Sequence, residues 1–244
     1  RDRRYIAANT KKKHIVLAPT GIAAINAGGS TLHSFFKLPF HPLLPNDSMY
    51  SVRNIRNTLK YNSEKIKIIR EVELIIIDEI SMVRADIIDF IDKVLRVYCR
   101  NMREPFGGKQ LLLVGDIYQL EPVVKEEDRK LLNPFYRSSF FFDAKIFQQF
   151  QLVSIELKKV YRQSDPVFIG ILDHIRTSQA QSQDLQLLNQ RVGAQLDESD
   201  SKLAITLSTR RDTVDFINEN QLKLLPGEPT LFRGCLLYTS PSPR

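Results

Sequence analysis

Two adjacent acids that follow a run of apolar residues are the strongest candidates for chemistry in this sequence. The segment LIIIDEIS places Asp78 and Glu79 directly after four apolar residues that are typical of a buried strand. In a parallel sheet, ligands bind beyond the carboxyl ends of the strands. In this Walker B pattern, Asp78 would hold Mg²⁺ through water, and Glu79 would orient or deprotonate the water that attacks a γ-phosphate. The alternative is an acidic loop or helix cap.

A second polar cluster follows the apolar run of LLLVGDIYQLEPV, residues 111–123. Gly115 permits a tight turn at the end of the predicted strand. Gln119 carries both a donor and an acceptor, which suits it to sensing a γ-phosphate or the attacking water. Asp116 and Gln119 are therefore candidate nucleotide-binding residues. The alternative is a plain strand and turn with Asp116 as a cap, but two such clusters in one chain favour a site.

Hydroxyl, small and aromatic side chains gather in VLAPTGIAAINAGGSTLHSFF, residues 16–36. Backbone amides at helix starts, together with hydroxyls, bind phosphates, and aromatic rings stack on unpaired bases. Alternatively, Phe35 and Phe36 are core residues and His33 is a hydrogen-bonded structural histidine. For at least one of the two phenylalanines, a place in the core is favoured. The candidates for contact with nucleic acid are Pro19, Thr20, Thr31, His33, Ser34 and Phe35.

The segment ELKKVYRQSD, residues 156–165, supplies one candidate cation. An arginine near a domain junction, here Arg162, can reach a triphosphate and stabilise the charge of the transition state. A surface salt bridge is the alternative for Arg162. Lys158 and Lys159 are interpreted as a solvated basic face.

The elements that must position these residues alternate between apolar runs and helical patterns. Such alternation favours an α/β fold with a parallel sheet covered by helices on both faces. The predicted strands are 14–18, 73–78, 110–116 and 151–157. The predicted helices between them are 21–28, 85–100 and 142–150.

The remaining segments indicate further parts. Residues 39–66 contain Pro39, Pro42 and Pro45 and are predicted to be inserted into the sheet fold. Helices are expected at 164–176, 185–192 and 211–225, and a buried strand at 202–209. The predicted organisation is a first motor-like domain at 1–160, a helical connector at 161–201, the start of a second α/β domain at 202–234, and a separate tail at 235–244.

Composition narrows the class of protein. The chain has 244 residues and a net charge of +7, but residues 1–13 hold six basic side chains against one acid, so the rest of the chain is close to neutral. Nucleic-acid binding must therefore be argued from local motifs.

The sequence has no apolar run of about 18 residues, which argues against a membrane span. Cys99 and Cys235 cannot form a disulfide framework or a zinc cluster, so a reducing intracellular compartment is expected.

Taken in order, these segments resemble the PIF-type (petite integration frequency) DNA helicases, which are RecA-like superfamily-one motors related to RecD-type helicases. The resemblance runs from about residue 14 to 225 and rests on five segments in the family's order. These are APTGIAA, GSTLHSFF, IIIDEISMV, GKQLLLVGDIYQLEPV and ELKKVYRQSD. It implies a RecA-like P-loop NTPase fold followed by the start of a second RecA-like domain.

The resemblance also implies an activity: ATP-driven translocation on single-stranded DNA and 5′-to-3′ unwinding of forked DNA by a monomeric motor. ATP and Mg²⁺ are the implied cofactors. Mg²⁺ coordination falls to Asp78, water activation to Glu79, γ-phosphate sensing to Gln119 and a phosphate contact to Arg162. The implied settings are DNA repair, recombination and telomere maintenance, in a bacterial cytoplasm or in a eukaryotic nucleus or mitochondrion.

One motif that the resemblance requires is absent from these 244 residues. No GxxxxGK[ST] run, whose amides and lysine cradle phosphates, occurs in the sequence. Because residues 1–10 are predicted to be the remainder of a longer helix, we expect this loop and a first strand to precede Arg1. Residues 235–244, CLLYTSPSPR, resemble a translated sequencing adapter, although a natural Ser/Pro-rich tail is the alternative. Two other functions stay open: a degenerate nucleic-acid-binding protein without ATPase activity, and a RecD-type subunit of an exonuclease.

Overall fold

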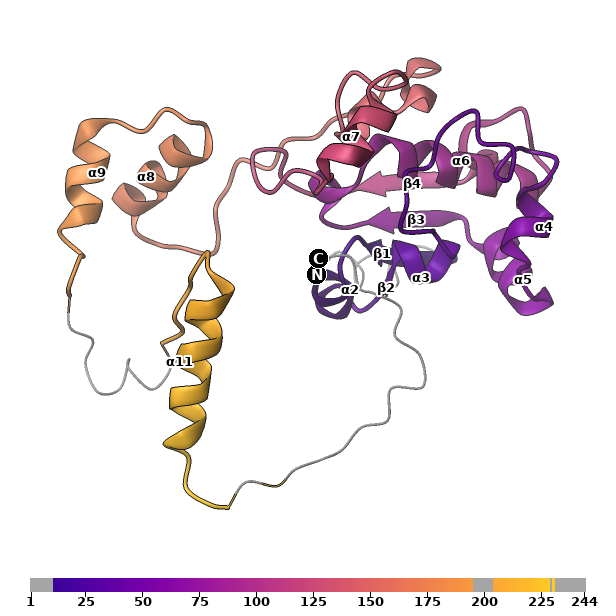
Figure 1. The fold of residues 1–244 in the computed structure, drawn as a ribbon. Coiled ribbons are helices and arrows are strands. Elements are labelled where there is room, and N and C mark those ends of the chain that lie inside the picture. Colours follow the sequence, from indigo (N-terminus) through magenta and orange to yellow (C-terminus); the bar gives the residue numbers. More distant parts are fainter. Residues whose placement is uncertain (1–10, 195–203, 229, 231–244) are drawn as a thin grey trace. The chain divides into compact units, whose positions relative to one another are not determined.

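The chain divides into two compact units, Arg1–Ser178 and Gln179–Arg244. A computed structural model describes residues 11–194, 204–228 and 230 of it. The first unit contains the sheet and the elements through α8 (Pro166–Arg176), and the second contains α9 (Ser182–Asn189) and α11 (Arg211–Lys223) (Figure 1). The predicted domain boundaries at residues 160 and 201 stay predictions.

A four-stranded parallel sheet is the framework of the first unit. Its order is β2 (Ser30–Thr31), β1 (His14–Ala18), β3 (Leu74–Ile77) and β4 (Gln110–Leu113). The predicted strands at 14–18, 73–78 and 110–116 are therefore confirmed. Because all four strands run in one direction, their carboxyl ends meet at one edge, where the candidate acids were expected.

The two faces of β3 are covered differently. Ile75 and Ile77 belong to the main core, together with the buried side of α6 (Ala85–Cys99), whereas Leu74 and Ile76 form a smaller cluster with Val16. This alternation follows from the two-residue period of a strand. All four residues of β3 are buried, as an apolar run in a covered parallel sheet requires. Figure 1 shows α6 running beside β3 and β4.

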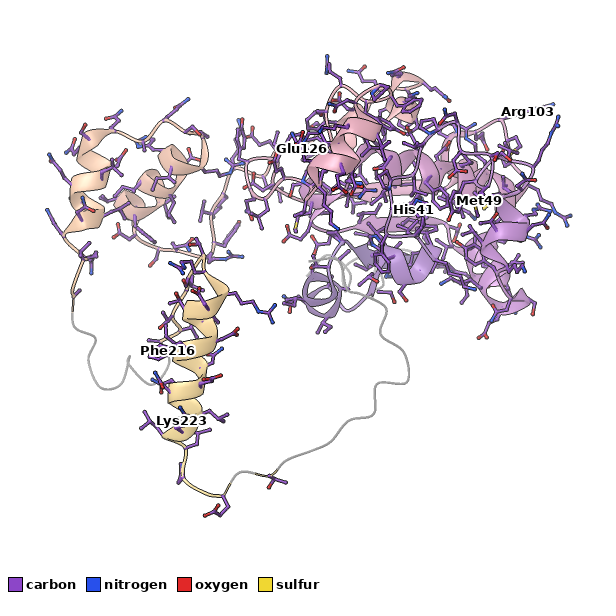
Figure 2. The ribbon with its side chains drawn as sticks, viewed as in Figure 1. His41, Met49, Arg103, Glu126, Phe216 and Lys223 are labelled. Atoms are coloured by element: carbon purple, nitrogen blue, oxygen red, sulfur yellow. The ribbon has the colours of Figure 1, made fainter. Side chains whose placement is uncertain are left out.

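The Pro-rich insertion at 39–66 adds no strand to the sheet and packs against α6. It contains α4 (Ile55–Leu59) and leads into α5 (Ser63–Glu71). The ring of Tyr50 lies edge-on to Phe90 of α6 with ring centroids 5.2 Å apart. Met49, in the same segment, is exposed to solvent (Figure 2). The insertion therefore shares the core of the first unit.

Most of the predicted helices form at or near the expected positions. The segments 21–28, 85–100, 164–176 and 211–225 contain α2 (Gly21–Asn26), α6, α8 and α11 respectively. The helix α9 overlaps the predicted segment 185–192 but begins and ends three residues earlier. Among the described residues, four helices were not predicted from the sequence: α3 (Leu32–Phe36), α4, α5 and α7 (Glu126–Leu132).

Three predictions for the sheet and its connections are wrong. Residues 151–157 form no strand and are exposed, with Val153 and Ile155 each more than 80% accessible. An extended segment becomes a strand only by hydrogen bonding to a partner strand, and no described strand pairs with this one. The described part of 202–209 likewise forms no strand. Residues 142–150 form two short 3₁₀ turns, Phe141–Asp143 and Lys145–Gln148, instead of one α-helix.

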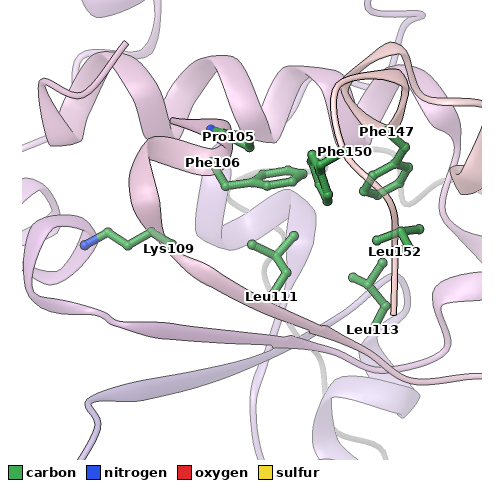
Figure 3. Close-up of a pocket in the computed structure, with 8 residues that line it drawn as sticks. All are labelled: Pro105, Phe106, Lys109, Leu111, Leu113, Phe147, Phe150 and Leu152. Atoms are coloured by element: carbon green, nitrogen blue, oxygen red, sulfur yellow. The ribbon is translucent and has the colours of Figure 1, made fainter. Parts of the chain in front are cut away.

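The strand β4 also departs from its predicted burial on both faces. Gln110 and Leu112 are exposed, and Leu111 and Leu113 are half-buried. The reason is that β4 pairs only with β3 and is the edge strand of the described sheet. Beside Leu111 and Leu113 lies an apolar pocket of about 190 Å³, which Phe106, Phe147, Phe150 and Leu152 also line (Figure 3).

Some predictions concern residues that the structure does not describe. The helix remnant at 1–10 and the tail at 235–244, which includes Cys235, lie outside the described residues. Within the described part of the chain, no helix is long and apolar enough to cross a membrane.

Candidate nucleotide and nucleic-acid sites

The chain turns sharply where it leaves β3, and this turn presents the two candidate acids. The Asp78 N–H donates to the carbonyl of Leu17 on β1 at 2.9 Å, which fixes the start of the turn. The Glu79 N–H donates to Asp78 Oδ1 at 3.0 Å. Glu79 has φ +52°, a left-handed conformation that side-chain-bearing residues rarely adopt and that recurs at functional sites. Both acids are half-buried at the carboxyl edge of the sheet.

The end of β4 is joined directly to this turn. The Ile80 N–H donates to the carbonyl of Val114 at 3.0 Å, so the residues after Glu79 are held against the strand end that leads to Asp116. A Cβ at Gly115 would lie 2.9 Å from the Ile80 nitrogen, so glycine is required at this close approach. Ser81 is buried here, and its hydroxyl has no hydrogen-bond partner among the described residues. The two predicted clusters therefore meet.

Asp116 is the centre of the second cluster. Its carboxylate accepts hydrogen bonds from the Tyr118 backbone N–H at 3.1 Å and from Gln119 Nε2 at 3.2 Å. It also accepts two from Arg176, whose Nε lies 2.7 Å from Oδ2 and whose Nη2 lies 3.1 Å from Oδ1. The hydrogen bonds from Arg176, above all, lower the pKa of Asp116, so this group is a carboxylate at neutral pH.

Sequence reasoning selected Arg162 and missed Arg176. Arg162 is exposed, and its side chain makes no hydrogen bond or ion pair with any described residue. Arg176 lies in the last turn of α8, a helix that the sequence predicted. Nothing in the spacing of Arg176 signals its partner, because Asp116 lies 60 residues earlier in the chain.

Two threonines begin the helices that follow β1 and β2. Thr20 Oγ1 accepts the Ala23 N–H at 3.2 Å at the start of α2, and Thr31 Oγ1 accepts the Ser34 N–H at 3.1 Å at the start of α3. In such N-caps the hydroxyl accepts from the helix and keeps its own hydrogen to donate elsewhere. Pro19, Thr20 and Thr31 are half-buried and Ser34 is exposed, so this surface is accessible.

The aromatic residues of this segment divide between core and surface. Phe35 and Phe36 are buried at 8% and 0% exposure, and the Lys65 ammonium lies 3.5 Å from the centre of the Phe35 ring. The core alternative therefore describes Phe35, whose ring is not open for stacking. His33 is half-buried and stacks on Phe40, which is 47% exposed and was not selected from the sequence. Burial, and then the charge of Arg84, lower the pKa of His33.

None of the predicted site residues lines the apolar pocket beside β4. The predicted metal ligand is Asp78, and among the described residues no group of three or more His, Cys, Asp or Glu side chains is arranged to hold a metal ion. A cation here would therefore depend on water and phosphate oxygens for most of its ligands.

The fold and these strand-end clusters define the class: a RecA-like α/β protein with acids at the carboxyl edge of a parallel sheet. Residues 4–184 match the model of the PIF1-like helicase family. This chain therefore belongs to the PIF1-like helicases.

Individual relatives agree with this assignment. The ATP-dependent DNA helicase PIF1 of Danio rerio is 32% identical over 236 residues, which is 95% of this chain and 34% of the relative. The PIF1 helicase of Homo sapiens is 32% identical over 90% of this chain and 32% of its own length. The chain thus spans about a third of the curated relatives that it matches.

Solved structures are also similar. The Bacteroides Pif1 helicase in complex with ADP-AlF3 and single-stranded DNA superposes with a TM-score of 0.81 and 40% identity, over 92% of this chain and 50% of that one. The Pif1 helicase from Candida albicans gives a TM-score of 0.74 and 30% identity over 93% of this chain and 47% of that one. The fold is therefore that of the Pif1 helicases.

Proposed function

We propose that this chain is part of an ATP-dependent DNA helicase that translocates on single-stranded DNA and unwinds forked duplexes in the 5′-to-3′ direction. The observation that carries the proposal is the meeting of the Asp78–Glu79 turn with the Asp116–Gln119 loop at the carboxyl edge of a parallel sheet. Family membership supports it, since relatives are ATP-dependent DNA helicases. A Bacteroides neighbour is bound to ADP-AlF3 and single-stranded DNA.

The residues present fit a magnesium ion held mainly by water and phosphate. Only Oδ1 of Asp78 accepts a hydrogen bond from a described residue, so the other carboxylate oxygen is available to a hydrated cation. When bound, the ion would offset charge on the phosphate oxygens. Glu79 would accept a proton from the attacking water, and Gln119 would donate to the γ-phosphate or orient that water.

The surface formed by Pro19, Thr20, Thr31, His33 and Ser34 would contact the single strand. The hydroxyls of Thr20 and Thr31 each have a hydrogen left to donate to a phosphate oxygen, and Ser34 is exposed beside them. The accessible ring is that of Phe40, stacked on His33, whereas Phe35 is in the core. Phe40 is therefore the aromatic residue of this surface that is placed to meet a base.

The proposed activity is that of a longer protein that includes these residues and a phosphate-binding loop. That protein would act as a monomer in genome maintenance, including repair, recombination and telomere maintenance. It would act where the DNA is, in a bacterial cytoplasm or in a eukaryotic nucleus or mitochondrion. Arg162 is exposed and forms no ion pair with a described residue, so its guanidinium is available. It would contact the phosphates and stabilise the charge of the transition state.

The test is Glu79→Gln in that longer protein. The substitution removes the base and retains Asp78, so ATP binding should be near normal while DNA-stimulated hydrolysis falls by about a hundredfold or more. Glu64→Gln, at an exposed acid in α5, is the control and should keep full turnover. Turnover and unwinding would be measured on forks with a 5′ or a 3′ tail. Unchanged hydrolysis in Glu79→Gln would exclude Glu79 as the base.

A further inference from the structure

One arginine outside every predicted motif makes the shortest hydrogen bond of the Asp116 carboxylate. Arg176 donates from Nε to Oδ2 at 2.7 Å and from Nη2 to Oδ1 at 3.1 Å, so both carboxylate oxygens are engaged by one planar guanidinium. The guanidinium carbon also lies 4.8 Å from the centre of the Tyr118 ring, in the same loop. Two-point contact of this kind fixes the orientation of a carboxylate as well as its charge.

The fixed carboxylate in turn holds the side chain that would sense phosphate. Gln119 Nε2 donates to Asp116 Oδ2, the same oxygen that accepts from Arg176 Nε. Gln119 is otherwise exposed, and no other hydrogen bond of its side chain to a described residue is present. Its orientation therefore depends on the rotamer of Asp116, and that rotamer depends on Arg176.

The contact also joins distant parts of the first unit. Arg176 lies at the end of α8, whereas Asp116 and Gln119 follow β4. The Arg176 side chain is 38% exposed and that of Asp116 is 21% exposed. A pair with this accessibility is not locked by burial, so it can open at modest cost.

We propose that Arg176 is a positioning residue that holds the Asp116–Gln119 loop in the orientation needed to sense a γ-phosphate, and so couples α8 to the nucleotide site. This inference rests on the proposed function for the role of Gln119. The contact by which Arg176 holds the Asp116–Gln119 loop does not depend on that function. The two parts can therefore be tested separately.

The first experiment measures amide hydrogen exchange of residues 114–121 in the 244-residue chain. Arg176→Ala should accelerate exchange of the Tyr118 and Gln119 amides by about three- to tenfold, because the carboxylate that orders them is released. Arg176→Lys should give a smaller change, since an ammonium keeps the charge and lacks the fork. Arg137→Ala removes an exposed arginine paired with Asp143 and should leave this loop unchanged. Equal exchange in wild type and Arg176→Ala would overturn the proposal.

The second experiment measures ATP turnover in the longer protein. Arg176→Ala should lower kcat about tenfold and raise KM for ATP much less, with partial rescue in Arg176→Lys. Adding Asp116→Asn should cost little more than the larger single effect, because the residues act as one unit. An unchanged kcat, or fully additive losses, would overturn the positioning role. Absence of turnover in the wild-type longer protein would instead overturn the proposed function, and the exchange result would still decide whether Arg176 holds the loop.

Discussion

Gly29 and Gly115 lie where two backbones approach too closely for any side chain. A Cβ at Gly29 would be 2.1 Å from the carbonyl oxygen of Val16, and one at Gly115 would be 2.9 Å from the nitrogen of Ile80. Both glycines adjoin the strand ends that carry the candidate residues. Gly170, inside α8, serves as a comparison because no atom of the described residues lies within 4 Å of its Cβ position. A glycine-to-alanine substitution should therefore lower the stability of the fold at Gly29 or Gly115 and raise it at Gly170.

Gly29→Ala should destabilise the chain and Gly170→Ala should stabilise it. The backbone of β1 must move to admit a methyl group at residue 29, at a cost of about 1–3 kcal/mol. In a helix the same change gains about 0.5–1 kcal/mol, because alanine has the higher helix propensity. Thermal or urea unfolding measures both. A Gly29→Ala variant as stable as wild type would show that the backbone approach at Val16 is not close in solution.

At the scale of elements, a buried ion pair ties the 39–66 insertion to the start of α6. The Asp86 side chain is fully buried and accepts two hydrogen bonds from Arg84, at 2.8 and 2.7 Å. It also accepts the Leu43 N–H at 2.9 Å, which anchors the insertion. Burial lowers the pKa of His33, the charge of Arg84 lowers it further, and the charge of Asp86 acts in the opposite direction.

Asp86→Ala should be among the more damaging substitutions outside the site. It leaves the Arg84 guanidinium, whose side chain is 13% exposed, without its partner and the buried Leu43 N–H without an acceptor, which together cost about 3–5 kcal/mol. Lys13→Ala is the control, because its ion pair with Glu71 has a similar distance of 2.8 Å but both side chains are exposed. That change should be small. Chemical unfolding compares the two, and equal effects would contradict the assigned cost of burial.

At the scale of the whole molecule, the 244 residues contain no phosphate-binding GxxxxGK[ST] run. The proposed catalytic residues Asp78 and Glu79 are present in these 244 residues without the amides and lysine that would cradle the β- and γ-phosphates. The 244-residue chain by itself should therefore hydrolyse no ATP above background. The assay is phosphate release with and without single-stranded DNA, using an intact PIF1-like helicase as the positive control. DNA-stimulated turnover comparable to that control would refute this prediction.

Much of the fold follows from local patterns. The run 74–77 is buried on both faces because it is apolar at every position, and α6 forms where apolar residues recur at helical spacing. The order of motifs along the chain was sufficient to indicate the helicase family. Predictions failed where a segment needed a neighbour, as at 151–157 and at the outer face of β4, because strand burial depends on pairing that a local pattern does not contain.

The amino-acid sequence by itself determined the candidate acids and the parallel sheet, since the acids follow an apolar run and the apolar runs alternate with helical patterns. Only the tertiary structure decided that Phe35 is a core residue, that the Phe40 ring beside His33 is exposed, and that Arg176 engages Asp116. Those outcomes depend on which surfaces pack together. A guanidinium and a carboxylate 60 residues apart meet only because α8 and the end of β4 fold to the same place.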